Sequence, residues 1–235
     1  MRADGADGNF SAGQKMNLEE IIRRIGEIGI VPVIRAANAA EASRVVDAVC
    51  AGGISVVEIT MTVPDAPRVL REVARANGDF LIGAGTVLNA KQAEICIDMG
   101  ARFLVSPGLA PEVIHTASKH GVLAIPGAFT PTEVMAAREL GAEVIKIFPC
   151  GSGGGPSHIK ALRAPFPDCR FIPTGGVNLK NAEEYFAAGA YALGIGAELA
   201  DLGALRRNEP HKLTEAAKAL AAIVHKHRAQ IKLQA

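Results

Sequence analysis

Short apolar runs rich in β-branched residues recur along the chain, and longer amphipathic stretches separate them. The runs are apolar without alternation, which is typical of parallel strands that are covered on both faces. Their starts lie about 20 to 27 residues apart. We therefore predict eight strands, at residues 30–34, 56–60, 80–83, 102–106, 122–125, 143–148, 170–173 and 192–195.

The stretches between these runs have the spacing of apolar residues that predicts helices. We expect helices at 41–50, 66–76, 90–99, 111–119, 131–140 and 182–188, and a further helix at the C-terminus. Eight strands alternating with helices is the pattern of an α/β fold, a single (β/α)8 TIM barrel. A doubly wound sheet is the alternative. We assign the barrel to residues 16–235, and residues 1–15, which hold three glycines and no apolar stretch, to a flexible tail.

An internal repeat supports the barrel. Four segments each begin with a glycine after a predicted helix and continue into the second, fourth, sixth or eighth strand; the glycines are Gly53, Gly100, Gly141 and Gly189. The fifth residue after each glycine is Glu58, Val105, Lys146 or Gly194. Side chains from alternate strands fill a barrel in layers of four, so we expect these residues to share a layer, with Glu58 facing Lys146. A layer with two opposite charges and two small partners leaves space for a ligand.

Lys146 lies within an apolar run that should be buried on both faces. Burial disfavours an ammonium ion and favours the neutral amine, which is a nucleophile toward carbonyl groups. A lysine that extends from a strand end to solvent, or a structural ion pair with Glu58, is the alternative. A lysine with a nearby carboxyl group suits Schiff-base chemistry, because the acid can transfer protons during carbinolamine formation and carbon–carbon cleavage.

Glycine-rich segments follow the last two predicted strands. Thr174, Gly175 and Gly176 follow the seventh strand, and Gly196 and Ala197 follow the eighth. Glycines let backbone N–H groups approach an anion, and barrels with phosphorylated substrates often hold the phosphate at these two loops. We therefore predict a phosphate site there. Thr86, after the third strand, could offer a hydroxyl group, and the glycine-rich segment 151–156 could be a loop over the site or a plain linker.

Composition excludes several classes of protein. The chain has 235 residues with a net charge of +1, no Trp and two Tyr, which argues against a nucleic-acid partner. No apolar run approaches the roughly 18 residues of a membrane span. The four cysteines form no C-x-x-C pair, so we expect reduced thiols and a cytoplasmic location, with Cys150 as a buried thiol. The six histidines have no metal-ligand spacing, so we expect neither a metal nor another cofactor.

Several motifs in order resemble one family. They are 31–34 (VPVI), 57–60 (VEIT), 83–88 (GAGTVL), 106–109 (SPGL), 125–127 (IPG), 146–149 (KIFP) and 173–177 (PTGGV). From about Leu18 to the C-terminal helix the chain is similar to the 2-keto-3-deoxy-6-phosphogluconate aldolases, a family that includes 4-hydroxy-2-oxoglutarate aldolases. The resemblance implies a class I aldolase on a (β/α)8 barrel, a homotrimer that cleaves a phosphorylated keto-deoxy sugar acid to pyruvate and glyceraldehyde 3-phosphate without metal.

The motif matches imply a role for each site residue. Lys146 would form the Schiff base and Glu58 would be the general acid and base. Four residues would line the pyruvate pocket: Thr86, Pro107, Phe148 and Thr174. Gly175, Gly176, Gly196 and Ala197 would meet the phosphate, although many members have a serine where this chain has Ala197, which keeps only its backbone donor.

One departure concerns the substrate carboxylate. Many members bind it with an arginine at the position of Thr62, whereas Arg35 resembles an arginine of the 6-phosphogalactonate branch. We expect Arg35 to hold the carboxylate, with a phosphate contact or a solvated loop position as alternatives. Other functions remain open: an aldolase for the galactonate epimer, a phosphosugar isomerase or epimerase with Glu58 as base, and a non-catalytic trimeric barrel.

Overall fold

The computed structural model describes residues 16–76 and 80–234, so the predicted tail at 1–15 lies outside the described residues. Parallel strands alternate with helices along the chain, which confirms the predicted α/β class. The strands are β1 (Ile30–Ile34), β2 (Val56–Thr60), β3 (Leu81–Gly85), β4 (Phe103–Val105), β5 (Leu123–Ile125), β6 (Gly127–Ala128), β7 (Val144–Ile147), β8 (Arg170–Pro173) and β9 (Leu193–Ile195).

The helices follow the prediction closely between the strands. They are α1 (Leu18–Ile28), α2 (Ala39–Ala51), α3 (Ala66–Ala76), α4 (Ala90–Asp98), α5 (Pro111–His120), α6 (Pro131–Glu139), α7 (Pro156–Arg163), α8 (Ala182–Ala187), α9 (Leu202–Arg206) and α10 (Pro210–Gln234), with a 3₁₀ turn at Gly151–Gly153. The sequence pattern did not predict α1, α7 or α9. Helix α1 precedes the first strand, and α7 starts within the glycine-rich segment, so neither fits a simple search for helices between apolar runs.

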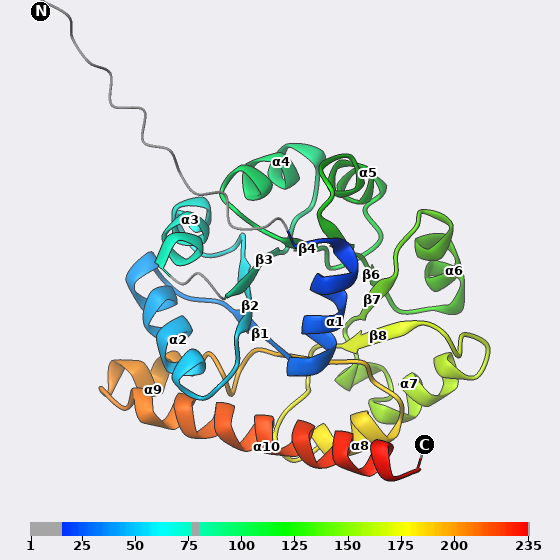
Figure 1. Cartoon of the computed structure of the whole chain (residues 1–235). Coiled ribbons are helices and arrows are strands. Elements are labelled where there is room, and N and C mark those ends of the chain that lie inside the picture. Colours follow the sequence, from blue (N-terminus) through cyan, green and yellow to red (C-terminus); the bar gives the residue numbers. More distant parts are fainter. Residues whose placement is uncertain (1–15, 77–79, 235) are drawn as a thin grey trace, which may run out of the picture.

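The strands form two parallel sheets. One has six strands in the order β5-β4-β3-β2-β1-β9, and the other has the order β6-β7-β8. Pro126 alone separates β5 from β6, and its carbonyl accepts a hydrogen bond of 2.9 Å from the Lys146 N–H. A parallel bridge between Thr174 and Gly194 joins the far ends of the two sheets. Figure 1 shows the strands curving around a common centre, with most of the helices outside them.

Alternate residues of each strand belong to two different cores. The outer core lies between the strands and the surrounding helices and includes Val57, Ile59, Ile145 and Ile147. The inner core lies among the strands and includes Val56, Leu81, Phe103, Val144 and Ile172. Because successive side chains of a strand point to opposite faces, Glu58 and Lys146, two residues after Val56 and Val144, also point inward.

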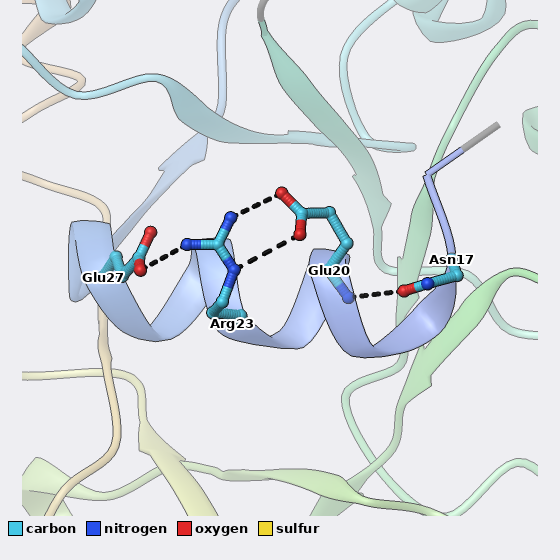
Figure 2. Close-up of polar contacts among 4 residues, drawn as sticks. All are labelled: Asn17, Glu20, Arg23 and Glu27. Atoms are coloured by element: carbon cyan, nitrogen blue, oxygen red, sulfur yellow. Dashed lines mark hydrogen bonds and ion pairs between the residues drawn. The ribbon is translucent and has the colours of Figure 1, made fainter. Parts of the chain in front are cut away.

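Helix α1 closes one end of the strand set. Its residues Ile21, Ile22 and Ile25 are buried in the inner core, and Figure 1 shows the helix lying across the strands. The Asn17 side chain accepts a hydrogen bond from the Glu20 N–H at 2.8 Å, which begins the helix, while Arg23 pairs with Glu20 and Glu27 on its outer surface (Figure 2). Since α1 fills the end where the strands begin, a ligand must enter from the end where they finish.

The strand register supports the predicted layer of four side chains. Gly194 pairs with Val31, whereas Glu58 pairs with Val33, a stagger of two residues. Glu58 in turn pairs with Gly83, whereas Val105 pairs with Gly85, which is the same stagger. A regular stagger between alternate strands is the geometry of strands tilted around an axis.

Candidate active site

Glu58 and Lys146 are buried charged residues on the inner face of the strands. Glu58 is 3% exposed and Lys146 is 5% exposed. Both lie beyond the apolar inner core, toward the ends of β2 and β7. Burying ionisable groups is costly unless each is paired or used, so this pair marks a functional-site candidate.

The carboxyl group of Glu58 occupies space that glycine leaves free. A Cβ atom at residue 85 would overlap Glu58 Oε1, so β3 can pass this carboxyl group only with glycine there. Glu58 Oε1 is buried and has no hydrogen-bond partner among the residues that the structure describes. Burial raises the pKa of Glu58, and the positive charges of Lys146 and then Arg35 oppose part of that increase. The Glu58 carboxyl group therefore favours its neutral form more than an exposed glutamate does.

Lys146 is held firmly by its neighbours on both sides. Residue 146 pairs with Gly127 of β6 and with Ile172 of β8. Its Nζ lies 5.1 Å from the centroid of the Phe148 ring, within the range of a cation–π contact. Phe148 follows β7 and lines the main cavity, whereas Lys146 itself is not part of that lining.

A cavity of about 420 Å³ opens where β1, β7, β8 and β9 end. Its lining includes predicted site residues from all four strand ends: Arg35, Phe148, Thr174, Gly175, Gly176, Gly196 and Ala197. Gly194, which the internal repeat singled out, lines it too. The lining also includes residues that the sequence analysis did not single out: Val33, Val177, Asn178, Glu198 and Ala200. Asn178 and Glu198 lie directly beside the two glycine-rich segments, and that proximity in sequence was the available signal.

The two glycine-rich loops present backbone donors to this cavity. Gly175 and Gly176 have φ angles of 85° and 80°, which favour glycine. Their carbonyl groups are already engaged, with the Gly151 N–H at 2.7 Å and with the Asn181 side chain at 2.9 Å. In the part of the chain that the structure describes, the N–H groups of both glycines have no hydrogen-bond partner. Free N–H groups beside a cavity can bind an anion.

Thr174 depends on a second glycine. It is buried, and its Oγ1 is directed at the backbone of Gly194, where any side chain would overlap it. Gly194 therefore fixes how closely β8 and β9 approach, and it keeps the Thr174 hydroxyl at the cavity wall.

Thr86 and Pro107 follow β3 and β4, and neither lines the main cavity. Thr86 has a φ of 59°, a left-handed conformation that costs a β-branched residue free energy. It directly follows Gly85 and so lies next to Glu58. The carbonyl of Pro107 packs closely on Gly127, the register partner of Lys146. Both residues are thus connected to the buried pair rather than to the glycine loops.

Arg35 is exposed at the end of β1 and lines the cavity together with the glycine loops. The position of Thr62 provides no cation. The Thr60 hydroxyl donates to the Ile34 carbonyl at 3.0 Å, and the hydroxyl groups of Thr60 and Thr62 lie 2.7 Å apart. With the Thr60 proton committed, Thr62 is the donor in that contact, so its own proton is also committed. Arg35 is the predicted cation that reaches the site.

The segment at 151–156 holds the 3₁₀ turn Gly151–Gly153 and the first residue of α7. The Cys150 and Gly151 N–H groups donate to the carbonyls of Thr174 and Gly175, at 2.9 and 2.7 Å, which ties the segment to the glycine loop after β8. Cys150 is buried, as predicted, and burial raises the pKa of its thiol, which makes it a poor nucleophile.

The residues that the structure describes contain no group of three or more His, Cys, Asp or Glu side chains that could hold a metal ion. No helix among them is long and apolar enough to cross a membrane.

Known proteins are similar to this chain in sequence and in fold. The family described as "KDPG and KHG aldolase" matches residues 21–216. A 2-dehydro-3-deoxy-phosphogluconate aldolase of Haemophilus influenzae is 37% identical over 169 residues, which are 72% of this chain and 80% of that protein. A probable 2-dehydro-3-deoxy-6-phosphogalactonate aldolase of Rhizobium meliloti is 40% identical over 172 residues, which are 72% of this chain and 81% of that protein.

A solved structure is similar over most of the chain. It is the KDPG aldolase of Legionella pneumophila with pyruvate captured at low pH as a covalent carbinolamine intermediate. It is 32% identical, has a TM-score of 0.80, and the match covers 85% of this chain and 97% of that one. The predicted resemblance and the predicted enzyme class, a carbon–carbon lyase, are thereby confirmed: this chain belongs to the KDPG and KHG aldolase family.

Proposed function

We propose that this protein is a class I aldolase that cleaves 2-keto-3-deoxy-6-phosphogluconate to pyruvate and glyceraldehyde 3-phosphate through a Schiff base on Lys146. The observation that carries the proposal is the buried pair of Glu58 and Lys146, in which Glu58 Oε1 has no hydrogen-bond partner within the described part of the chain. An amine nucleophile and a carboxylic acid at one site are the two groups that imine chemistry needs.

Each proton in the reaction has a place in this arrangement. Neutral Lys146 Nζ attacks the C2 carbonyl carbon, and one amine proton passes to the carbonyl oxygen to give the carbinolamine. Neutral Glu58 then protonates the carbinolamine hydroxyl, which leaves as water and gives the iminium ion. The resulting Glu58 carboxylate removes the proton of the C4 hydroxyl as the C3–C4 bond breaks, with its electron pair passing to the iminium nitrogen. Glyceraldehyde 3-phosphate leaves. Glu58 then protonates C3 of the enamine. In the hydrolysis that follows, its carboxylate takes a proton from the attacking water, and pyruvate, the free lysine and neutral Glu58 result. The raised pKa of Glu58 favours the neutral form with which this cycle begins.

The rest of the site binds the two ends of the substrate. The N–H groups of Gly175, Gly176, Gly196 and Ala197 would hold the phosphate. Thr86, Pro107, Phe148 and Thr174 would line the pyruvate end, where Arg35 would hold the carboxylate. Nothing in this cycle requires a metal ion or another cofactor.

The quaternary and overall architecture are also part of the proposal. We place residues 16–235 in one (β/α)8 barrel, supported by the hydrogen bond from Lys146 to Pro126 and by the bridge from Thr174 to Gly194, which connect the two sheets at both edges. We propose a cytoplasmic homotrimer, as the family resemblance implies. The exposed apolar side chains of Leu88 and Ile95, on and beside α4, are available for such an association.

A second substrate has specific support. The relative from Rhizobium meliloti carries the name of a probable 6-phosphogalactonate aldolase. In this chain Arg35 lines the cavity, and Thr62 occupies the position at which many family members have an arginine. The two sugar acids are epimers at C4, the carbon whose hydroxyl proton Glu58 removes. 4-Hydroxy-2-oxoglutarate is a further substrate of the same chemistry.

The test is to incubate the purified protein with each C4 epimer separately and to measure pyruvate release. The proposal predicts release from the gluconate epimer at a rate that Lys146→Ala abolishes. If only the galactonate epimer releases pyruvate, the substrate is the 6-phosphogalactonate compound and not the 6-phosphogluconate compound. The absence of release from either epimer and from 4-hydroxy-2-oxoglutarate would reject the aldolase function.

A further inference from the structure

The two glycine loops of the cavity are joined by the side chain of Glu198. Leu179, in the loop after β8, donates its backbone N–H to Glu198 Oε2 at 2.7 Å. Glu198 lies in the turn after β9, directly beside Ala197, and it also lines the cavity. The hydrogen bond therefore connects the loop that carries Gly175 and Gly176 with the turn that carries Gly196 and Ala197.

The loop after β8 is braced internally by two asparagines. The Asn178 N–H donates to Asn181 Oδ1 at 2.8 Å, and the Lys180 N–H donates to Asn178 Oδ1 at 2.9 Å. The Asn181 side chain also holds the Gly176 carbonyl at 2.9 Å. These hydrogen bonds hold the loop in one internal conformation, and its position relative to the other loop depends on what connects the two.

The turn after β9 is also closed on itself. The Ala200 N–H donates to the Gly196 carbonyl at 2.8 Å, so the backbone around Glu198 is fixed. Ala197 can donate only its backbone N–H to an anion. It has no side-chain hydroxyl that could still reach the anion if the turn were displaced. The spacing between the two loops therefore decides whether donors from both sides reach one anion.

Glu198 is an acidic residue in the wall of a cavity that we propose binds an anion. A carboxylate that lines an anion cavity repels the anion unless its charge is engaged elsewhere. A hydrogen bond from a backbone N–H to a carboxylate is about twice as strong as one between neutral groups. Engaging Glu198 with Leu179 partly neutralises the carboxylate and uses it to hold the two loops together.

We propose that Glu198 is a positioning residue that sets the spacing of the two glycine loops and so determines the preference of this site for phosphorylated substrates. The inference rests on the proposed function. It concerns the distal end of the substrate only, and leaves the reaction at Lys146 unchanged.

The test compares two aldehydes that differ only in the phosphate. Pyruvate is condensed with glyceraldehyde 3-phosphate or with glyceraldehyde, and kcat and KM are measured for each. Glu198→Ala removes the hydrogen bond, whereas Glu198→Gln keeps an acceptor for the Leu179 N–H. Glu183→Ala, which removes an exposed acid paired with Lys226 on α8 and α10, is the matched control.

We expect Glu198→Ala to raise KM for the phosphorylated aldehyde by roughly tenfold, the effect of losing part of a charged hydrogen bond. Its kcat, its activity with glyceraldehyde and the trapping of pyruvate on Lys146 should stay within about twofold of the unmodified protein. Glu198→Gln should restore most of the preference, and Glu183→Ala should match the unmodified protein.

Three results would overturn the inference: an unchanged preference in Glu198→Ala, an equal loss with both aldehydes, or a Glu198→Gln variant as impaired as Glu198→Ala. Failure of the proposed function would look different. The unmodified protein would then neither trap pyruvate nor condense it with either aldehyde, and the inference would fall with it.

Discussion

Gly85 faces the carboxyl group of Glu58, and the missing side chain at residue 85 provides the space in which that carboxyl group lies. Gly85 is on β3 and Glu58 is on the neighbouring strand β2, so the position of the acid depends on a residue that takes no part in chemistry. The same region holds Thr86 in a left-handed backbone conformation, with a φ of 59°. The acid is thus placed by the backbone of β3 as much as by its own strand.

Gly85→Ala should displace the Glu58 carboxyl group and lower kcat by at least tenfold. Inserting a methyl group into a packed interior costs about 1–3 kcal/mol of stability. Displacement of the Glu58 carboxyl group relieves this cost. The control is Gly108→Ala, because a Cβ at residue 108 meets no atom within 4 Å. The measurement is the steady-state cleavage rate of each folded variant. Equal rates in both would contradict the claim that the missing side chain at residue 85 positions the Glu58 carboxyl group.

Glu58→Gln should lower turnover by about 10²–10⁴-fold, the usual contribution of general acid–base catalysis. The amide keeps the shape of the side chain but cannot exchange the proton. Trapping of pyruvate on Lys146 should survive in part, because the lysine is intact. Full turnover in this variant would reduce Glu58 to a structural neighbour of Lys146.

The raised pKa of Glu58 also predicts a pH dependence of stability. Folding favours the neutral carboxyl group, so the contribution of Glu58 to the free energy of unfolding is fully present below the unfolded pKa of about 4.5 and is lost as pH rises through the folded pKa. Relative to Glu58→Gln, the unmodified protein should therefore lose stability as pH rises above about 4.5. Denaturant unfolding of both proteins at a series of pH values measures the difference. A difference that is constant with pH, or that grows in favour of glutamate, would contradict the raised pKa.

Arg35→Ala tests where the substrate carboxylate lies. If Arg35 binds the carboxylate, its loss should weaken pyruvate and the full substrate alike, by roughly the 1.5–3 kcal/mol of a charged hydrogen bond. Arg35 lines the cavity beside the phosphate loops, so the alternative of a phosphate contact makes a distinct prediction. Pyruvate affinity would then be unchanged, while the preference for phosphorylated aldehydes would be lost.

A saturating chelator should leave the rate of cleavage unchanged, because the proposed reaction uses only protein side chains. The rate is measured before and after prolonged dialysis against the chelator. Loss of activity that zinc or cobalt restores would show that a metal takes part.

Sequence periodicity predicted the parts of the fold in which each strand lies between two helices. The bounds of β1, β2 and β8 are those expected. The inward direction of Glu58 and Lys146 followed from the internal repeat, and their burial followed from the apolar runs around them. The extension of β3 to Gly85 was missed because glycines there look like a turn. In fact Gly83 and Gly85 are needed where the Phe103 ring and the Glu58 carboxyl group approach the strand. Local composition cannot distinguish these two uses of glycine.

The sequence predicted which residue types form the candidate site, but not all the contacts that hold those residues in place. Glycine-rich segments after the last two strands indicated an anion site, and the structure places them around one cavity. The role of Glu198 depends on a contact between two loops, because it accepts a hydrogen bond from Leu179, a residue 19 positions away. No periodic pattern encodes such contacts.

Borohydride trapping of pyruvate tests the central claim most directly. The protein is incubated with pyruvate and reduced, and the mass of the intact chain and of its peptides is measured. The account predicts one stable pyruvyl adduct per chain on Lys146, present in the unmodified protein and absent from a folded Lys146→Arg variant, which should also lose cleavage activity because a guanidinium group forms no imine. An unchanged mass of the unmodified protein, or an adduct on another lysine, would contradict it.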